Sequence, residues 1–440
     1  MAERKRIYLC LAHMSDEGLE QKYIKEAFDT NWVVPLGPNV NGFEKDLEEF
    51  VNGPAESAEN AVSLNKRVVA LSAGTAAVHL ALLACGVGPG DEVLVQSFTF
   101  CASSHPITYL GATPVFIDSE RETWTMDPEL LEEAIKDRIA KTGKKPKAIV
   151  PVALYGMPYK IDRIMEIADK YGIPVVEDAA EGFGSKFNGQ VLGTFGKYGV
   201  LSFNGNKMIT TSGGGALITE NEDEWREIMM YATQYRESYP YYQHEKIGYN
   251  YRMSNICAGI GRGQMTVVND HIAHHKHVQA LYEELLKDVK GVTVHCQPKC
   301  PAEIAENAEM VPEYDSNYWL CTITLDPSVK IKGQENAYKT IVTGAVGGAA
   351  GVIHAASSAT TDCQPNDNVE ALRVYLDQAQ IEARPVWKPM HKQPVYASAP
   401  AYVNGVSEEI FKIGMCLPAG PYVSDEDVKY IVETIKSAII

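Results

Sequence analysis

The chain has 440 residues, 45% of them apolar and 22% charged, a composition typical of a globular protein long enough to build two hydrophobic cores. Its 40 lysine and arginine residues against 57 aspartate and glutamate residues give a formal net charge of -17 at pH 7, which argues against nucleic acid and anionic membranes as partners. The nine cysteines are scattered as in proteins with reduced thiols, and the sequence contains no run of 18 apolar residues, so we expect a cytoplasmic protein that spans no membrane.

The N-terminal region is expected to contain a strand, two helices and a loop insertion. The apolar run from Ile7 to Ala12 predicts a strand, because it is too short for a signal peptide and no cleavage site follows it. Apolar residues at helical spacing predict helices over Tyr23–Asp29 and Gly42–Val51. The polar stretch from Gly53 to Asn65 predicts a loop insertion.

From residue 67 onward, strands and helices alternate, which predicts a mostly parallel sheet covered on both faces. Such sheets bind ligands at the carboxyl ends of their strands. Strands are expected at Val68–Ser72, Glu92–Gln96, Pro114–Ile117, Ala148–Val152, Pro174–Asp178 and Val200–Phe203, and helices at Thr75–Cys85, Cys101–Leu110, Pro128–Lys141 and Lys160–Tyr171.

The C-terminal part has a different pattern. Helices are expected around Trp225–Arg236, Ser254–Leu286, Val369–Asp377 and Asp425–Ile440, and a strand at Tyr318–Leu325. We therefore expect an α/β protein with a large domain over residues 1–265 and a smaller α+β domain over residues 266–440, which carries an insertion near 330–367.

One lysine lies between the end of a short strand and a glycine-rich turn. A short apolar strand ends near Ser202, Gly205 breaks it, and Lys207 follows before a glycine-rich turn at Gly213-Gly214-Gly215. A lysine in a fixed, partly desolvated position can form a Schiff base, as it does with pyridoxal phosphate (PLP). The alternative is an ordinary surface lysine at a strand end.

A candidate anion site lies where the first of the alternating strands meets its helix. In Ser72-Ala73-Gly74-Thr75-Ala76-Ala77, Gly74 permits a tight turn and the helix begins at Thr75, so free backbone N–H groups and the positive helix end face an anion. A phosphate needs further donors, and Ser202 is a suitable one. Many other α/β turns share this pattern.

Two carboxylates and one aromatic ring complete the candidate site. Asp178 ends an apolar strand, where it could face a protonated pyridine nitrogen or cap the next helix. Glu181 could reach the phenolic oxygen of the cofactor or complete a capping box. Phe100 could lie against a planar ring, although core packing is the commoner place for a phenylalanine.

Metal and dinucleotide sites find little support, and we expect no metal. Four histidines, His271, His274, His275 and His277, lie on one expected helix, but a solvated face explains them as well as a metal site does. No Gly-x-Gly-x-x-Gly follows an expected strand, which argues against a dehydrogenase.

From about Trp32 to the C-terminus, interrupted by the two insertions, the chain resembles the DegT/DnrJ/EryC1/StrS sugar aminotransferases, which are PLP enzymes of fold type I with a seven-stranded sheet. The resemblance is carried by Ser72-x-Gly74-Thr75-Ala76-Ala77, Glu177-Asp178-Ala179-Ala180-Glu181, Ser202-Phe203 with Lys207 and Gly213-Gly214-Gly215, Gly248-Tyr249-Asn250-Tyr251-Arg252-Met253 and Arg384-Pro385-Val386-Trp387-Lys388-Pro389-Met390-His391.

The resemblance implies a role for each matching residue. Lys207 would bind PLP and move the proton, Asp178 would pair with the pyridine nitrogen, and Phe100 would stack on the ring. Many members have glutamine or histidine where this chain has Glu181. Gly74, Thr75 and Ser202 would bind the phosphate, and Asn250 would reach the phosphate of the neighbouring subunit, so that a homodimer shares its active sites.

The resemblance further implies amino transfer from glutamate to a nucleotide-linked keto sugar, most similar to UDP-linked 4-keto-6-deoxy amino-sugar precursors, in surface polysaccharide or glycan biosynthesis. Arg252, Arg384 and Lys388 are candidates for binding the diphosphate, which needs cations that the acidic chain otherwise lacks. Two alternatives stay open, a non-catalytic PLP-binding protein and a sugar dehydratase. Relatives that dehydrate replace the lysine with histidine, so Lys207 favours transamination.

Overall fold

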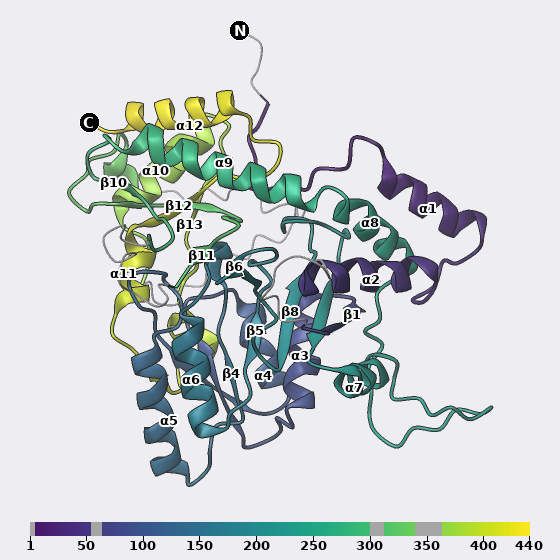
Figure 1. Cartoon of the computed structure of the whole chain (residues 1–440). Helices are drawn as coiled ribbons and strands as arrows, with labels where there is room; N and C mark the ends of the chain where they lie inside the picture. The colour runs from purple at the N-terminus through teal and green to yellow at the C-terminus, as the bar shows by residue number, and fades with distance from the viewer. Residues whose placement is uncertain (1–4, 54–63, 300–311, 339–362) are drawn as a thin grey trace, which may run out of the picture.

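A computed structural model of the chain describes residues 5–53, 64–299, 312–338 and 363–440. A large sheet forms the centre of the molecule (Figure 1). Its strands run in the order β1-β9-β8-β5 and then β4-β2-β3-β14, and parallel bridges between Ile149 and Val175 and between Val152 and Asp178 join the two halves. The strands are β1 (Arg67–Leu71), β9 (Gly215–Thr219), β8 (Tyr198–Ser202), β5 (Val176–Asp178), β4 (Ala148–Val150), β2 (Glu92–Gln96), β3 (Thr113–Ile117) and β14 (Ala401–Tyr402).

Seven of these strands, from β1 to β3, form the sheet that was expected, and β14 adds a short eighth strand at the edge. Strand β9 runs antiparallel to β1 and β8, and the other pairings are parallel. The α/β fold class is therefore confirmed.

Alternate residues of each strand face opposite helix layers, as the period of two requires. Val68 and Ala70 of β1 lie in the core beneath α2 (Pro38–Asn52), α5 (Pro128–Thr142), α6 (Ile161–Tyr171) and α8 (Asn255–Met265). Val69 and Leu71 lie in the core of the opposite face, which is covered by α3 (Gly74–Ala84), α4 (His105–Tyr109) and α7 (Glu222–Ala232). The first helix, α1 (Leu19–Asp29), packs on α8.

A second, antiparallel sheet lies beside the large one (Figure 1). It has the order β10-β12-β15-β13, and its core contains residues from α9, α10 and α12 together with Ile7. The elements are α9 (Val268–Leu286), β10 (Val292–Val294), β12 (Cys321–Leu325), α10 (Asp367–Gln378), β13 (Arg384–Pro385), α11 (Val406–Ile413), β15 (Gly414–Leu417) and α12 (Asp425–Ala438). This arrangement is the α+β part that was expected. The boundary between domains at residues 265 and 266 stays a prediction.

Three short strands form a small third sheet in the order β11-β6-β7, namely β6 (Lys186–Phe187), β7 (Gln190–Val191) and β11 (Tyr314–Asp315). Short 3-10 turns occur at Cys101–Ser103 (η1), Leu154–Gly156 (η2), Gln334–Asn336 (η3), Met390–Lys392 (η4) and Pro394–Tyr396 (η5). Among the described residues, no helix has the combination of length and hydropathy needed to cross a membrane.

Four expectations about elements are corrected. Ile7–Ala12 forms a single bridge, from Ile7 to Ile381, and no strand. The helix expected over Cys101–Leu110 divides into η1 and α4, and the long one over Ser254–Leu286 divides into α8 and α9. Gly215, expected in a turn, begins the buried strand β9. Most of both expected insertions, at residues 54–63 and 339–362, lies outside the described residues.

Candidate active site

A cavity of about 430 Å³ lies where β1, β2, β5 and β8 reach their carboxyl ends. Parallel strands that end side by side bring the residues that follow them to one edge of the sheet. Segments that are far apart in sequence therefore meet here. Seven of the expected site residues line this cavity, namely Gly74, Thr75, Phe100, Asp178, Glu181, Ser202 and Lys207.

Lys207 lines the cavity from a turn that follows β8, where its backbone N–H donates to the carbonyl of Asn204 at 3.0 Å. Its Nζ lies 3.4 Å from Oε1 of Glu181 and 4.0 Å from the centre of the Trp319 ring. The side chain is only 13% exposed. The lysine is therefore held in place by a buried carboxylate and an aromatic face, and it is not a surface lysine.

Asp178 ends β5 and is buried. Its Oδ2 accepts a hydrogen bond from the Ser103 hydroxyl at 2.6 Å, and its Oδ1 accepts one from the Ala180 N–H at 3.1 Å. Burial raises the pKa of Asp178, while the bonds from Ser103 and Ala180 and the nearby Lys207 lower it. No helix begins between Asp178 and β6, so the helix-capping alternative is wrong.

Glu181 is the second buried carboxylate of the cavity. Its Oε2 accepts a hydrogen bond from the Tyr155 N–H at 2.7 Å, which leaves Oε1 facing Lys207. Burial raises the pKa of Glu181, whereas Lys207 and the Tyr155 N–H lower it and Asp178 raises it further. Since no helix starts here, Glu181 is not part of a capping box.

The N-terminus of α3 faces the same cavity. Ala73 has extended backbone angles and the first helical bond runs from the Ala77 N–H to the Ala73 carbonyl, so no acceptor among the described residues takes the N–H groups of Gly74, Thr75 and Ala76. A Cβ on Gly74 would lie 3.0 Å from the Cβ of Ser202. Only a glycine lets the first turn of α3 approach β8 this closely, and the resulting cradle suits an anion.

The remaining expected residues lie apart from this group. The Arg252 side chain is 8% exposed, forms an ion pair with Glu44 and donates to the Ala70 carbonyl at 3.0 Å. Arg384 pairs with Glu382 at 2.6 Å. Neither lines the cavity, and the same holds for Lys388 and Asn250, although Lys388 directly follows the cavity residue Trp387. Of the described residues that line the cavity, Lys207 is the sole cation.

Three aromatic rings line the cavity, Phe100, Trp319 and Trp387, and the sequence analysis assigned a role only to Phe100. Phe100 is 48% exposed, and its ring centre lies 5.3 Å from that of Trp387. Tyr155 lies nearly parallel to Trp387 on one side and to Trp319 on the other, with ring centres 6.2 and 6.4 Å away. Trp387 stands within a motif that carried the resemblance, whereas Tyr155 and Trp319 reach the site through tertiary contacts that no local pattern reveals.

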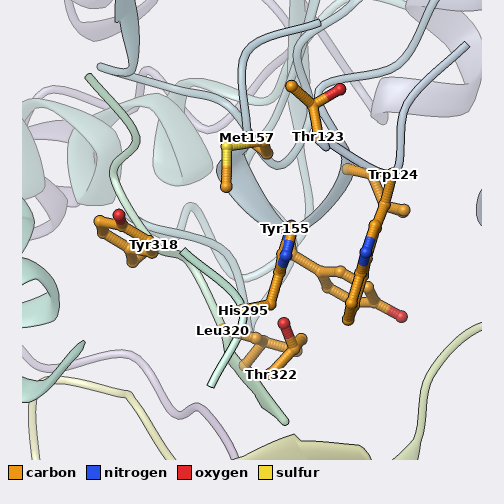
Figure 2. Close-up of a pocket in the computed structure, with 9 residues that line it drawn as sticks. Thr123, Trp124, Tyr155, Met157, His295, Tyr318, Leu320 and Thr322 are labelled. Carbon is orange, nitrogen blue, oxygen red and sulfur yellow. The ribbon is translucent and has the colours of Figure 1, made fainter. Parts of the chain in front are cut away.

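A separate small cavity of about 10 Å³ is lined by Tyr155, Trp124 and His295, among others (Figure 2). Here the ring of His295 stacks on Trp124, with centres 3.7 Å apart and planes 7° from parallel. Burial lowers the pKa of His295 to about 4. The space admits about one water molecule, so it is a packing gap and not a substrate site.

Two of the four histidines expected on one helix are buried on α9. His271 Nδ1 lies 3.2 Å from the Met208 carbonyl, and His275 Nδ1 lies 3.2 Å from the Tyr318 carbonyl. The solvated-face interpretation of these two side chains is therefore wrong, because they hold α9 against the segment next to Lys207 and the segment next to Trp319.

The chain matches the model of the DegT/DnrJ/EryC1/StrS aminotransferase family over residues 15–326 and 334–436. It is 39% identical to a protein of Bacillus subtilis (strain 168) named as the pyridoxal phosphate-dependent aminotransferase EpsN, over 98% of this chain and 95% of that protein. It is 32% identical to GDP-perosamine synthase of Escherichia coli O157:H7, over 97% of this chain and 98% of that protein. A crystal structure of a DegT DnrJ EryC1 StrS aminotransferase from Brucella abortus is 26% identical, covers 96% of this chain and 95% of its own, and superposes with a TM-score of 0.76.

These matches span nearly the whole chain and confirm the resemblance to the sugar aminotransferases. The chain belongs to the DegT/DnrJ/EryC1/StrS aminotransferase family and is a pyridoxal phosphate-dependent aminotransferase.

Proposed function

We propose that this aminotransferase carries an amino group from glutamate to a nucleotide-linked keto sugar, and that Lys207 is its catalytic residue. The observation that carries the proposal is the meeting of Lys207, Asp178 and the free N-terminus of α3 in one cavity. A cation, an anion and an anion-binding helix end are the three partners that an aromatic aldehyde with a ring nitrogen and a phosphate requires.

The residues present fit PLP group by group. The free N–H groups of α3 and the hydroxyls of Thr75 and Ser202 would hold the phosphate. Asp178 would hold the protonated ring nitrogen, and the Phe100 ring would cover one face. The bound group supplies an electron sink that weakens the bonds at the α-carbon of an amine joined to it.

The chain's own residues then handle the protons. Lys207, once released from the cofactor, would move a proton at the α-carbon of the bound amine, and its position 3.4 Å from Glu181 keeps it directed into the cavity. Glu181 would lie near the phenolic oxygen of PLP, and the Tyr155 N–H keeps its side chain in one orientation. Trp319 covers Lys207 from the other side and excludes water there.

The acceptor sugar would enter beside Phe100 and Trp387, where the cavity is open and aromatic. The amino-acid sequence around Asn250 favours a UDP-linked sugar as the acceptor. The relative from Escherichia coli O157:H7, in contrast, is named for a GDP-linked sugar. Lys388 is the best placed of the proposed diphosphate ligands, because it directly follows the cavity residue Trp387. Arg384 stays a candidate, and Arg252 would first have to leave Glu44.

We also propose that two copies of the chain share their active sites. Asn250 is exposed at the end of segment 233–250, which extends away from the body of the chain after α7 (Figure 1). This segment exposes Tyr241, Tyr242 and Ile247, which are 59%, 74% and 84% accessible. Large apolar side chains on a projecting segment are typical of a surface that a partner covers.

The activity is tested by a two-stage assay. PLP-loaded protein is first mixed with glutamate, and conversion of the cofactor to its aminated form is followed by absorbance. UDP- and GDP-linked 4-keto sugars are then added separately, and products are identified by mass. Formation of an amino sugar supports the proposal. A protein that binds PLP without reacting with glutamate, or that removes water from the sugar without forming an amine, contradicts it.

A further inference from the structure

Two hydroxyl groups of the segment that follows β2 form a series of hydrogen bonds that ends at Asp178. The Thr99 hydroxyl lies 2.9 Å from the Ser103 hydroxyl, which in turn lies 2.6 Å from Oδ2 of Asp178. All three side chains are buried and line the cavity. No motif in the sequence marks either hydroxyl.

The direction of these hydrogen bonds follows from the charge of Asp178. A carboxylate can only accept hydrogen bonds, so Ser103 must donate its single proton to Asp178. The Ser103 oxygen is then an acceptor, and Thr99 must donate to it. Together with the Ala180 N–H on Oδ1, each oxygen of Asp178 receives one protein donor, which fixes the plane of the carboxylate.

A donor at this place has an electrostatic effect as well. Burial raises the pKa of Asp178 and favours its neutral form, and the bond from Ser103 is the first of the influences that oppose burial, followed by the Ala180 N–H and Lys207. Asp178 in turn raises the pKa of Glu181, the other buried carboxylate of the cavity.

The same segment also presents the Phe100 ring. Thr99 and Ser103 bracket Phe100, and the Ser103 N–H donates to the Phe100 carbonyl at 3.3 Å. The segment therefore positions two residues of the cavity at once, the Phe100 ring and the Asp178 carboxylate.

We propose that Ser103, supported by Thr99, is a positioning residue that holds Asp178 as an oriented carboxylate against the ring nitrogen of PLP. This inference rests on the proposed role of Asp178. It does not depend on which sugar accepts the amine.

The test compares Ser103→Ala with Ser104→Ala as a matched control. Ser104 is the adjacent buried serine, but its hydroxyl contacts the Cys101 carbonyl and the sulfur of Met390 and does not contact Asp178. PLP binding to the apoenzyme is followed by quenching of the fluorescence of Trp319 and Trp387, which line the cavity. It is measured at pH 8 and then across the acid range.

In the Ser103→Ala protein, the dissociation constant for PLP should rise about tenfold, and the pH at which half of the PLP is released should move up by about one unit, because the carboxylate has lost a charge-assisted donor. Ser104→Ala should match the wild type, and Thr99→Val should shift both quantities in the same direction by less. If Ser103→Ala does not fold, Thr99→Val decides the test.

The proposal is overturned if Ser103→Ala binds and releases PLP as the wild type does, or if Ser104→Ala shifts the release as far. A failure of the sugar assay leaves both results standing, because neither measurement involves a sugar. Conversely, normal amino transfer with an unshifted acid release would refute the role of Ser103 alone.

Discussion

Asp178 and Glu181 are buried carboxylates three residues apart, and their partners give them different tasks. Asp178 receives an O–H and an N–H donor from the protein, whereas Glu181 receives one N–H and faces Lys207. Burial raises the pKa of both groups. Two carboxyl groups in different surroundings commonly divide the charged and the proton-carrying roles between them.

Replacing Asp178 with Asn should lower the rate of the glutamate half-reaction roughly 100-fold or more, because a neutral amide cannot keep the ring nitrogen protonated. The amide oxygen can accept from the Ala180 N–H, and the amide NH2 can donate to the Ser103 oxygen, so the fold should survive. Rapid-mixing absorbance measures the rate. Asp169→Asn, an exposed position on α6, is the control, and a half-reaction equally fast in both variants would refute the role of Asp178.

At the scale of elements, the turn between β1 and α3 depends on a residue without a side chain. Gly74→Ala would place a Cβ 3.0 Å from the Cβ and 3.2 Å from the Oγ of Ser202, so that one of the two must move. We expect the dissociation constant for PLP to rise about tenfold or more, because the phosphate cradle loses its geometry. Gly88→Ala has open space around the new Cβ and should bind PLP normally. Equal affinities measured by fluorescence titration would contradict this account of the cradle.

Helix α9 makes the stability of the protein depend on pH. Burial lowers the pKa of His275 from 6.5 to about 3, with a smaller contribution from His274. Between these values the unfolded chain binds a proton that the folded chain does not, so the stability contributed by the neutral imidazole is present above pH 6.5 and is lost as the pH falls toward 3.

The free energy of unfolding of the wild type should therefore fall by about 1–2 kcal/mol from this group alone between pH 6.5 and pH 5. The His275→Gln variant should show a correspondingly smaller fall. Urea unfolding of the apoenzyme at the two pH values measures both. If the wild type and the variant lose the same free energy, His275 is not the source of the dependence.

Sequence patterns predicted the strands that consist of a run of apolar residues bounded by turn-forming residues. Strand β2 has the expected bounds and β1 differs by one residue, since both are runs of buried residues between clear turn signals. Strand β9 was not predicted because Gly213-Gly214-Gly215 reads as a turn, yet Gly215 is paired with Leu71 of β1. A Cβ at Gly215 would lie 2.4 Å from the backbone of Ala73, so this glycine serves close packing and not a bend.

The candidate site could be predicted in part, namely for the residues that lie in sequence motifs. Its residues in sequence motifs, such as Lys207 and Asp178, do meet in one cavity. Their partners Ser103 and Trp319 could not be assigned, because each contacts the site only after chain segments about 75 or more residues apart have come together. Arg252 illustrates the opposite case. Its charge is visible in the sequence, but its pairing with Glu44 is a tertiary contact.

At the scale of the whole molecule, the projecting segment 233–250 predicts that active sites are shared between copies. The proposed dimer should elute at about twice the mass of 48.4 kDa in size-exclusion chromatography with light scattering. Lys207→Ala and Asn250→Ala should each be inactive when pure. If Asn250 acts on the neighbouring site, a mixed dimer carries one site with both residues intact.

Mixing the two inactive variants after mild dissociation should therefore restore up to about a quarter of the wild-type activity per chain, the share of intact sites in a statistical mixture. Lys207→Ala mixed with itself is the matched control. A monomeric active enzyme, or a mixture that stays inactive although the dimers exchange, would contradict the sharing of sites.

The central claim of the account is a covalent bond between Lys207 and PLP inside the cavity. Borohydride reduction of the loaded enzyme, followed by proteolysis and mass spectrometry, tests it most directly, with Lys287→Ala, a surface position on the loop after α9, and Lys207→Ala as comparison proteins. The account predicts that the reduced cofactor stays on the peptide containing Lys207 in the wild type and in Lys287→Ala, and on no peptide of Lys207→Ala. A label on a different lysine, or none on the wild type, would contradict it.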